Sequence, residues 1–168
     1  MAKTKSTALK KAKSVSRAKK SKASTTRARP ASRTAPLAKR KSRPAQRVAV
    51  SHLQNAKFVA GLRAYAHYRD LGIAEATYGA AQAHVIRLIG PCDPKEVSKL
   101  HFHDVEFQMV YVLKGWTKVY LEGEGEVMMR EGSCWTQPPK IKHLIRDYSD
   151  NCELLEIILP AEFKTVEL

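Results

Sequence analysis

Charge is divided so unevenly along this 168-residue chain that only part of it is expected to form a folded core. Residues 1–47 contain 17 Lys or Arg and no acidic residue, whereas the remaining 13 basic and all 16 acidic residues follow position 47. The large apolar residues of the basic segment, Leu9, Val15 and Leu37, are too few to offset the entropy that an ordered backbone would lose. The sequence therefore predicts a disordered basic tail at 1–47 and one folded domain after it.

Three roles are compatible with this tail. Lys and Arg neutralise phosphate groups, so the tail could bind nucleic acid without sequence preference. An Arg- and Ser-rich, acid-poor N-terminus is also typical of organelle transit peptides. The third alternative is a solvated extension that has no partner. No apolar run approaches the length that crosses a bilayer, so we expect no membrane association and a cytoplasmic protein, or a nucleoid-associated one if the tail binds DNA.

Short β-rich segments separated by turn signals predict an all-β fold, a single jelly-roll β-barrel. We assign residues 48–62 to a linker or peripheral element and residues 63–168 to the barrel. The segment 72–79 reads as a connector that contains one helical turn, and the segment after Pro160 as a tail that wraps the outside. The expected strands are 65–71, 82–89, 101–113 with a candidate bulge around 104–106, 116–121, 126–130 and 153–159. Three cysteines without short spacings indicate free thiols in a reducing compartment.

Two histidines two residues apart point to a metal site in this barrel. Side chains alternate faces along an extended strand, so His101 and His103 point the same way. His143 follows later, behind Gly132 and the Pro138-Pro139 turn. Neutral imidazole is a common ligand for first-row transition metals, and three imidazoles would leave coordination positions open for a substrate.

These two stretches resemble the paired motifs of the cupin superfamily, specifically its small single-domain members. The first motif runs Gly, five residues, His-x-His, three or four residues, Glu, six residues, Gly. Here it reads His101, His103, Gln108 and Gly115. The second motif runs Gly, five residues, Pro-x-Gly, two residues, His, three residues, Asn. Here it reads Gly132, Pro138, Lys140, His143 and Asp147. The resemblance covers roughly residues 83–160 and implies a jelly-roll barrel.

The chain departs from the motifs at Gln108, Lys140 and Asp147, which replace the usual Glu, Gly and Asn. The leading Gly of the first motif is also displaced, since Lys95 stands at its place and Gly90 is the nearest glycine before it. The resemblance implies that His101, His103 and His143 bind one divalent transition metal, Fe, Mn, Ni or Zn, with Gln108 as a candidate fourth ligand. An amide oxygen neutralises none of the ion's charge, so such a site should favour an anionic ligand from solution. The alternative is that Gln108 is a polar residue of the barrel interior, bonded to a histidine or to water.

His52, His67 and His84 lie outside both motifs and read as ordinary histidines, although His84 could support a ligand from behind. No Ser-His-Asp order, phosphate-binding glycine loop or CxxC pair is present, so the sequence gives no support to nucleophilic or nucleotide-using chemistry. The sequence thus predicts a metal-binding cupin that acts on a small anionic ligand or substrate, as a dioxygenase or isomerase. The alternatives are a non-enzymatic ligand sensor and a nucleic-acid-associated barrel. A homodimer is expected from the resemblance.

Overall fold

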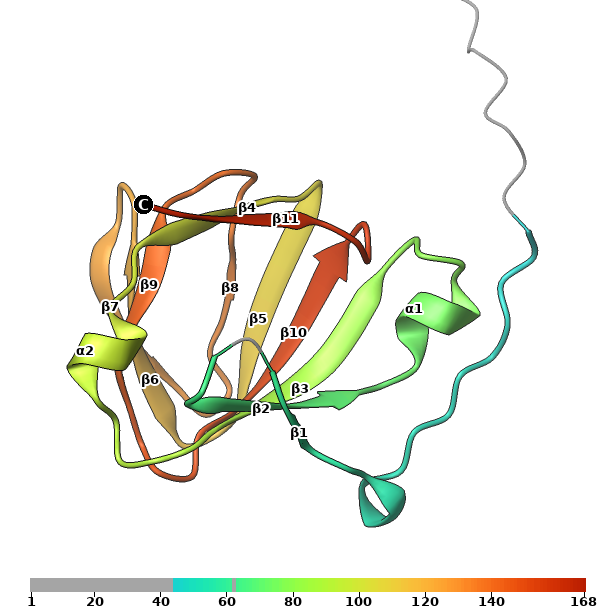
Figure 1. Ribbon diagram of the computed structural model, residues 1–168, viewed down its shortest axis with the longest axis horizontal. Helices are drawn as coiled ribbons and strands as arrows, with labels where there is room; N and C mark the ends of the chain where they lie inside the picture. Colours follow the sequence, from blue (N-terminus) through green and yellow to red (C-terminus); the bar gives the residue numbers. More distant parts are fainter. Residues whose placement is uncertain (1–43, 62) are drawn as a thin grey trace, which may run out of the picture. The chain divides into compact units, whose positions relative to one another are not determined.

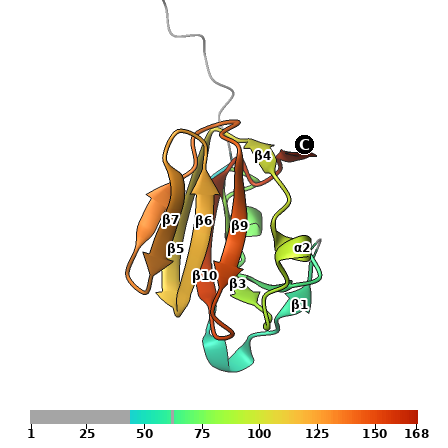
Figure 2. The same ribbon diagram turned by 90° about the vertical axis from the view of Figure 1, so that its left-hand side faces the viewer.

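The computed structural model describes residues 44–61 and 63–168, and it consists of two antiparallel β-sheets that face each other (Figures 1 and 2). Most of the predicted tail, residues 1–43, lies outside this described part. The six-stranded sheet has the order β1 (Val59–Ala60), β2 (Ala66–Asp70), β3 (Gln82–Leu88), β10 (Glu153–Leu159), β5 (Phe107–Lys114) and β8 (Cys134–Thr136). The five-stranded sheet has the order β11 (Lys164–Glu167), β4 (His101–Asp104), β9 (His143–Tyr148), β6 (Trp116–Leu121) and β7 (Gly125–Arg130).

Within residues 44–61 and 63–168, helical structure is limited to three short turns: η1 (Leu53–Asn55), α1 (Ile73–Ala76) and α2 (Pro94–Val97). The α1 turn lies in the connector where the sequence predicted one. The α2 turn was missed, although its signals are local: Asp93 accepts a hydrogen bond from the backbone N–H of Lys95 at 2.9 Å, and Pro94 opens the turn. No helix in the described residues is long and apolar enough to cross a membrane. The all-β jelly-roll prediction is confirmed.

Strand β5 shows why the sheet faces could be read from the sequence. Gln108, Val110 and Val112 are at most 3% exposed, whereas the alternate residues Phe107 and Tyr111 are more than a third exposed. This period of two is what a sheet with one face in the core requires. Gln108, Val110 and Val112 therefore face the core.

The expectation of one continuous strand over 101–113 is wrong. The chain leaves the five-stranded sheet after β4, passes through Val105 and Glu106, and enters the six-stranded sheet as β5. Val105 is buried between the two strands, and the backbone N–H of Glu106 bonds the Leu159 carbonyl at 2.7 Å. The two histidines and Gln108 consequently belong to opposite sheets and approach the interior from different sides.

The C-terminal segment also differs from the prediction. It returns to the five-stranded sheet as β11, which pairs antiparallel with β4, so that Thr165 lies opposite His103 and Glu167 opposite His101. The two strands run side by side in Figure 1. The last residues of the chain thus flank the histidine strand instead of only wrapping the outside.

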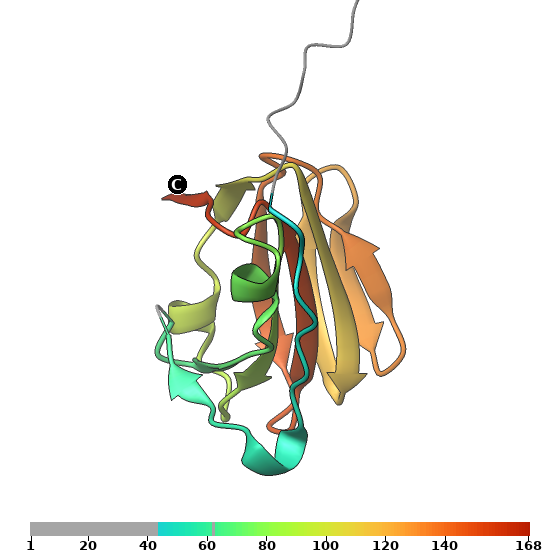
Figure 3. The same ribbon diagram turned by 90° about the vertical axis from the view of Figure 1, so that its right-hand side faces the viewer.

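Residues 44–60 pass along the outside of the domain next to α1 (Figure 3). The Arg47 backbone N–H donates to the Ala76 carbonyl at 2.9 Å, and β1 pairs with β2. The boundaries at residues 47 and 62 remain predictions. All three cysteines are free, with Cys152 buried in the core and Cys134 exposed. Cys134 therefore does not line the barrel interior.

Candidate metal centre

Three histidine rings meet inside the barrel. His101 and His103 come from β4, and His143 is the first residue of β9, where it pairs directly with His101. The ring centroid of His101 lies 4.4 Å from that of His143 and 5.1 Å from that of His103, and the remaining pair is 5.0 Å apart. One nitrogen of each ring lies within 4.8 Å of those of the other two. The predicted histidines are thus brought together at a place that could hold a metal ion.

Each of these rings is held by its Nδ1 atom. The Nδ1 of His101 lies 2.8 Å from the Lys99 carbonyl oxygen, and that of His143 lies 3.0 Å from the carbonyl oxygen of Ile141. A carbonyl only accepts, so Nδ1 carries the proton in both rings and Nε2 keeps its lone pair. The Nδ1 of His103 lies 2.9 Å from the Thr165 hydroxyl, which can donate or accept, so this contact orients the third ring without assigning its proton. Outer hydrogen bonds of this kind orient metal-binding histidines, so these residues fit a metal ion.

Burial keeps the rings neutral. It lowers the pKa of His143 and of His103 to about 4, and it also lowers the pKa of His101. The other histidine rings oppose protonation further, because a positive charge on one disfavours a charge on the next. At neutral pH the cluster therefore offers uncharged imidazole, the form that binds metals.

Gln108 is buried and is bonded to a carboxylate that the sequence analysis missed. Its Nε2 donates to Glu156 on β10 at 2.6 Å, and the other carboxylate oxygen of Glu156 lies 2.6 Å from the Nε2 of His84. Burial alone would raise the pKa of Glu156, but the hydrogen bonds from His84 and Gln108 and the charge of His84 together lower it. An ionised carboxylate therefore lies inside the barrel behind Gln108.

The amide oxygen of Gln108 is buried and has no partner in the part of the chain that the structure describes. An unpaired buried acceptor is unfavourable, so this oxygen is suited to a donor or a cation. The structure thus agrees with the interior position that the sequence analysis considered for Gln108, but the amide bonds Glu156 instead of a histidine. The role of its Oε1 atom as the fourth ligand that the cupin motif implies stays a prediction.

Lys140, which stands where the second motif has glycine, adopts the backbone conformation that glycine favours. Its φ angle is +64°, in the left-handed region that side chains disfavour. Its backbone N–H donates to the His103 carbonyl at 3.0 Å, so the turn before β9 is tied to the histidine strand. The usual glycine at this place therefore has a conformational reason, and Lys140 occupies it at a cost.

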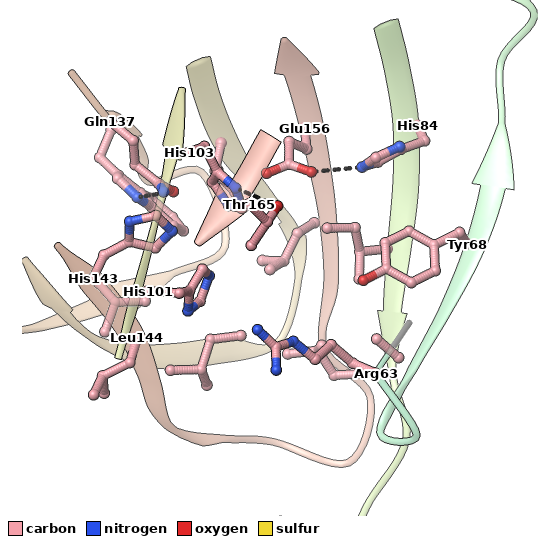
Figure 4. A pocket seen from close by; sticks show the side chains of 18 of the residues that line it. Arg63, Tyr68, His84, His101, His103, Gln137, His143, Leu144, Glu156 and Thr165 are labelled. Atoms are coloured by element: carbon pink, nitrogen blue, oxygen red, sulfur yellow. Dashed lines mark hydrogen bonds and ion pairs between the residues drawn. The ribbon is translucent and has the colours of Figure 1, made fainter. Parts of the chain in front are cut away.

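The three histidines form part of the wall of a cavity of about 280 Å³ (Figure 4). Much of the remaining wall is apolar, including Ile86, Leu88 and Leu154. Polar groups enter it at a few points, among them Arg63, Glu156 and Gln137. A mostly apolar cavity with a few placed polar groups is the usual form of a small-molecule site.

Three residues of this cavity were not found from the sequence: Glu156, Arg63 and Thr165. Glu156 is a single acidic residue in an otherwise apolar strand, LLEIIL, and such an interruption is a usable signal of an interior polar group. Arg63 and Thr165 carry no such signal, because they reach the site through contacts between distant parts of the chain. His84, which the sequence analysis considered as a support for a metal ligand, lies in the wall of the cavity. Its ring bonds Glu156, however, and not one of the three clustered histidines.

Comparisons with known proteins agree with this architecture. Residues 92–158 match the family model described as Cupin domain, and no curated protein matches the chain in sequence. The polyketide cyclase RemF from Streptomyces resistomycificus superposes with a TM-score of 0.55 at 17% identity, covering 70% of this chain and 83% of RemF. Oxalate decarboxylase from Bacillus subtilis superposes with a TM-score of 0.54 at 18% identity, covering 73% of this chain but only 32% of the decarboxylase.

A third similar structure is that of FeII HppE, with a TM-score of 0.53 and 14% identity over 67% of this chain and 60% of HppE. At these identities the likeness concerns the fold. The family match spans both histidine motifs, from the residues before β4 to the end of β10. Residues 92–158 of this chain therefore carry a cupin domain.

Proposed function

We propose that this domain binds one divalent transition metal and uses it to act on a small anionic organic molecule, as a dioxygenase or an isomerase. His101, His103 and His143 would hold the ion, with the Gln108 amide oxygen as a fourth donor. The observation that carries the proposal is the anchoring of all three Nδ1 atoms, which leaves each Nε2 free. When bound, the ion would supply Lewis-acid chemistry or activation of dioxygen.

The residues of the chain would orient the substrate and exclude water. The apolar wall formed by Ile86, Leu88 and Leu154 favours an organic body in the cavity, and it lowers the local dielectric constant. Glu156 is positioned to accept a hydrogen bond or a proton from a substrate group, since His84 and Gln108 occupy one direction at each of its oxygens. Neutral ligands leave the ion's charge uncompensated, which supports an anionic substrate.

A titration with Co(II) tests the proposed site, because the visible absorption of this ion reports on its ligands. Chelator-treated protein should develop a visible band that saturates at one equivalent of Co(II) per chain. Adding azide, a small anion, should change the band if a coordination position is open. Gradual binding without saturation, or a band that azide leaves unchanged, would contradict a single open site. Turnover of candidate acids under oxygen would then separate an enzyme from a ligand sensor.

A second candidate function concerns the basic segment. Residues 1–47 carry 17 Lys or Arg without a single Asp or Glu. This composition supports sequence-independent binding of nucleic acid by neutralisation of phosphates. The basic segment would then attach the cupin domain to the nucleic acid. Removing residues 1–47 should abolish such binding, and the salt dependence described in the Discussion tests it.

A further inference from the structure

Arg63 is the only residue with a permanent positive charge in the wall of the cavity formed by residues 44–61 and 63–168. It comes from the segment just before β2, and its side chain is only 12% exposed. Figure 4 shows the guanidinium group extending into the cavity on the side of His101. A buried guanidinium is found where a carboxylate or phosphate is recognised, because its five N–H donors match such groups.

The guanidinium already holds one carboxylate, and that carboxylate belongs to the end of the chain. The Nη1 of Arg63 lies 2.5 Å from a carboxylate oxygen of Glu167 on β11. The Glu167 side chain is 55% exposed, so solvent reaches this group and it can turn away without breaking the core. The pair demonstrates that a carboxylate fits at this place, while the remaining N–H groups of Arg63 stay available to a ligand.

A second donor faces the same cavity. The Oε1 of Gln137 accepts from the indole N–H of Trp135 at 3.2 Å, which fixes the orientation of the amide. Its Nε2 is buried and has no partner among the described residues. By contrast, the cavity's carboxylate, Glu156, is already matched by His84 and Gln108. Apart from the histidine Nε2 atoms and the Gln108 amide oxygen, which the proposed metal would engage, the polar groups open to a ligand here are N–H donors, and they favour a ligand rich in acceptors.

We propose that Arg63 binds the carboxylate of an organic acid in this cavity, and that Glu167 occupies the same guanidinium when the acid is absent. The Gln137 amide N–H donates to a further oxygen of the bound acid. Glu167 then acts as an internal competitor that leaves when the acid enters. This inference deepens the proposed function, since it rests on the same cavity and names the group that recognises the charge of the substrate.

Two variants separate anion recognition from a purely structural ion pair. Arg63→Met removes the guanidinium, whereas Glu167→Gln breaks the ion pair and leaves the guanidinium free. If Arg63 served only to hold β11, the two changes would have the same effect. Arg146→Met is the matched control, because Arg146 pairs with Glu126 on the outside of the five-stranded sheet and does not line the cavity.

Phenylacetate and its uncharged amide, phenylacetamide, are suitable probes, since they share one shape and the ring can pack on the apolar wall. Binding is measured by calorimetry on the full-length protein, as purified and after chelator treatment. We expect phenylacetate to bind more tightly than phenylacetamide, Arg63→Met to weaken phenylacetate at least about tenfold, and Glu167→Gln to keep or strengthen it. Arg146→Met should leave the affinity unchanged.

Equal weakening by Arg63→Met and Glu167→Gln would overturn the proposal, as would equal affinity for the acid and the amide in the parent protein. Absence of phenylacetate binding would overturn it as well. The chelator-treated sample keeps this test apart from the metal proposal. If phenylacetate binds the metal-free protein and this binding depends on Arg63, the anion site is supported even when no metal is found. If the protein binds a metal but phenylacetate binding does not depend on Arg63, only the anion site is refuted.

Discussion

The amide nitrogen of Gln108 lies 2.6 Å from a carboxylate oxygen of Glu156, and this contact explains how the barrel accommodates glutamine at a place where the cupin motif has glutamate. The negative charge is present in the interior, but it lies one strand away, on β10 instead of β5. A hydrogen bond to a carboxylate polarises the amide and increases the electron density on its free oxygen. Glu156 can thereby make the amide oxygen of Gln108 a stronger metal ligand without itself reaching the histidine cluster.

Exchanging these two residues tests that relationship. Gln108→Glu alone places two carboxylates against each other, so like-charge repulsion should limit its gain in metal affinity. The double variant Gln108→Glu, Glu156→Gln keeps the charge and moves it to the ligand position. It should bind Zn(II) more tightly than either single variant in a competition with a chromogenic chelator. Weaker binding than in Gln108→Glu alone would count against Gln108 as a ligand.

The stability of the metal-free protein should depend on pH in a defined direction. The pKa values of His103 and His143 are lowered to about 4 in the folded protein, so the unfolded chain takes up protons first as the pH falls. The free energy of unfolding is therefore highest above pH 6.5, the approximate pKa of histidine in the unfolded chain. It decreases between about pH 6.5 and 4, by up to about 3 kcal/mol for each histidine. Thermal unfolding across this range measures the slope.

His103→Gln should reduce that slope, while His52→Gln, an exposed position far from the cluster in sequence, should leave it unchanged. A slope that is the same in both variants would show that burial of the cluster is not its cause.

Lys140→Gly should stabilise the domain. The left-handed backbone of Lys140 costs roughly 1 to 2 kcal/mol relative to an ordinary conformation, and the greater freedom of glycine in the unfolded chain offsets part of the gain. We expect a net increase of about 0.5 to 1 kcal/mol in the free energy of unfolding. The matched change Lys142→Gly, at a neighbouring position without a positive φ, should not stabilise. Denaturant unfolding of both variants decides the matter.

The basic segment predicts salt-dependent binding of DNA. Full-length protein should retard DNA of unrelated sequences equally in gel electrophoresis. Its affinity should fall steeply between about 50 and 200 mM salt, because the release of counterions from DNA becomes less favourable as the salt concentration rises. A chain beginning at residue 48 should not retard DNA under the same conditions. Retardation by the shortened chain would place the binding on the cupin domain instead.

The sequence predicted the fold and the histidine cluster because both depend on local spacing. A period of two places Val110 and Val112 on one face of their strand, which the structure shows to be the buried face, and the two histidine motifs lie in register with the strands that carry them. The alternation indicated an irregularity around residues 104–106, but a bulge and a change of sheet could not be told apart, because neither leaves a period of its own over two or three residues. Glu156 and Arg63 were missed because their contacts join strands that are remote in sequence, and only the closed barrel places them beside the histidines.

The metal content of the purified protein tests the central claim most directly. Elemental analysis after purification without chelator, and after reloading, should find about one divalent transition metal per chain. His101→Ala combined with His103→Ala should remove it from a domain that stays folded, while the matched pair His52→Ala and His67→Ala should retain it. Metal content that is the same in both double variants, or a parent protein that takes up no ion, would contradict the account.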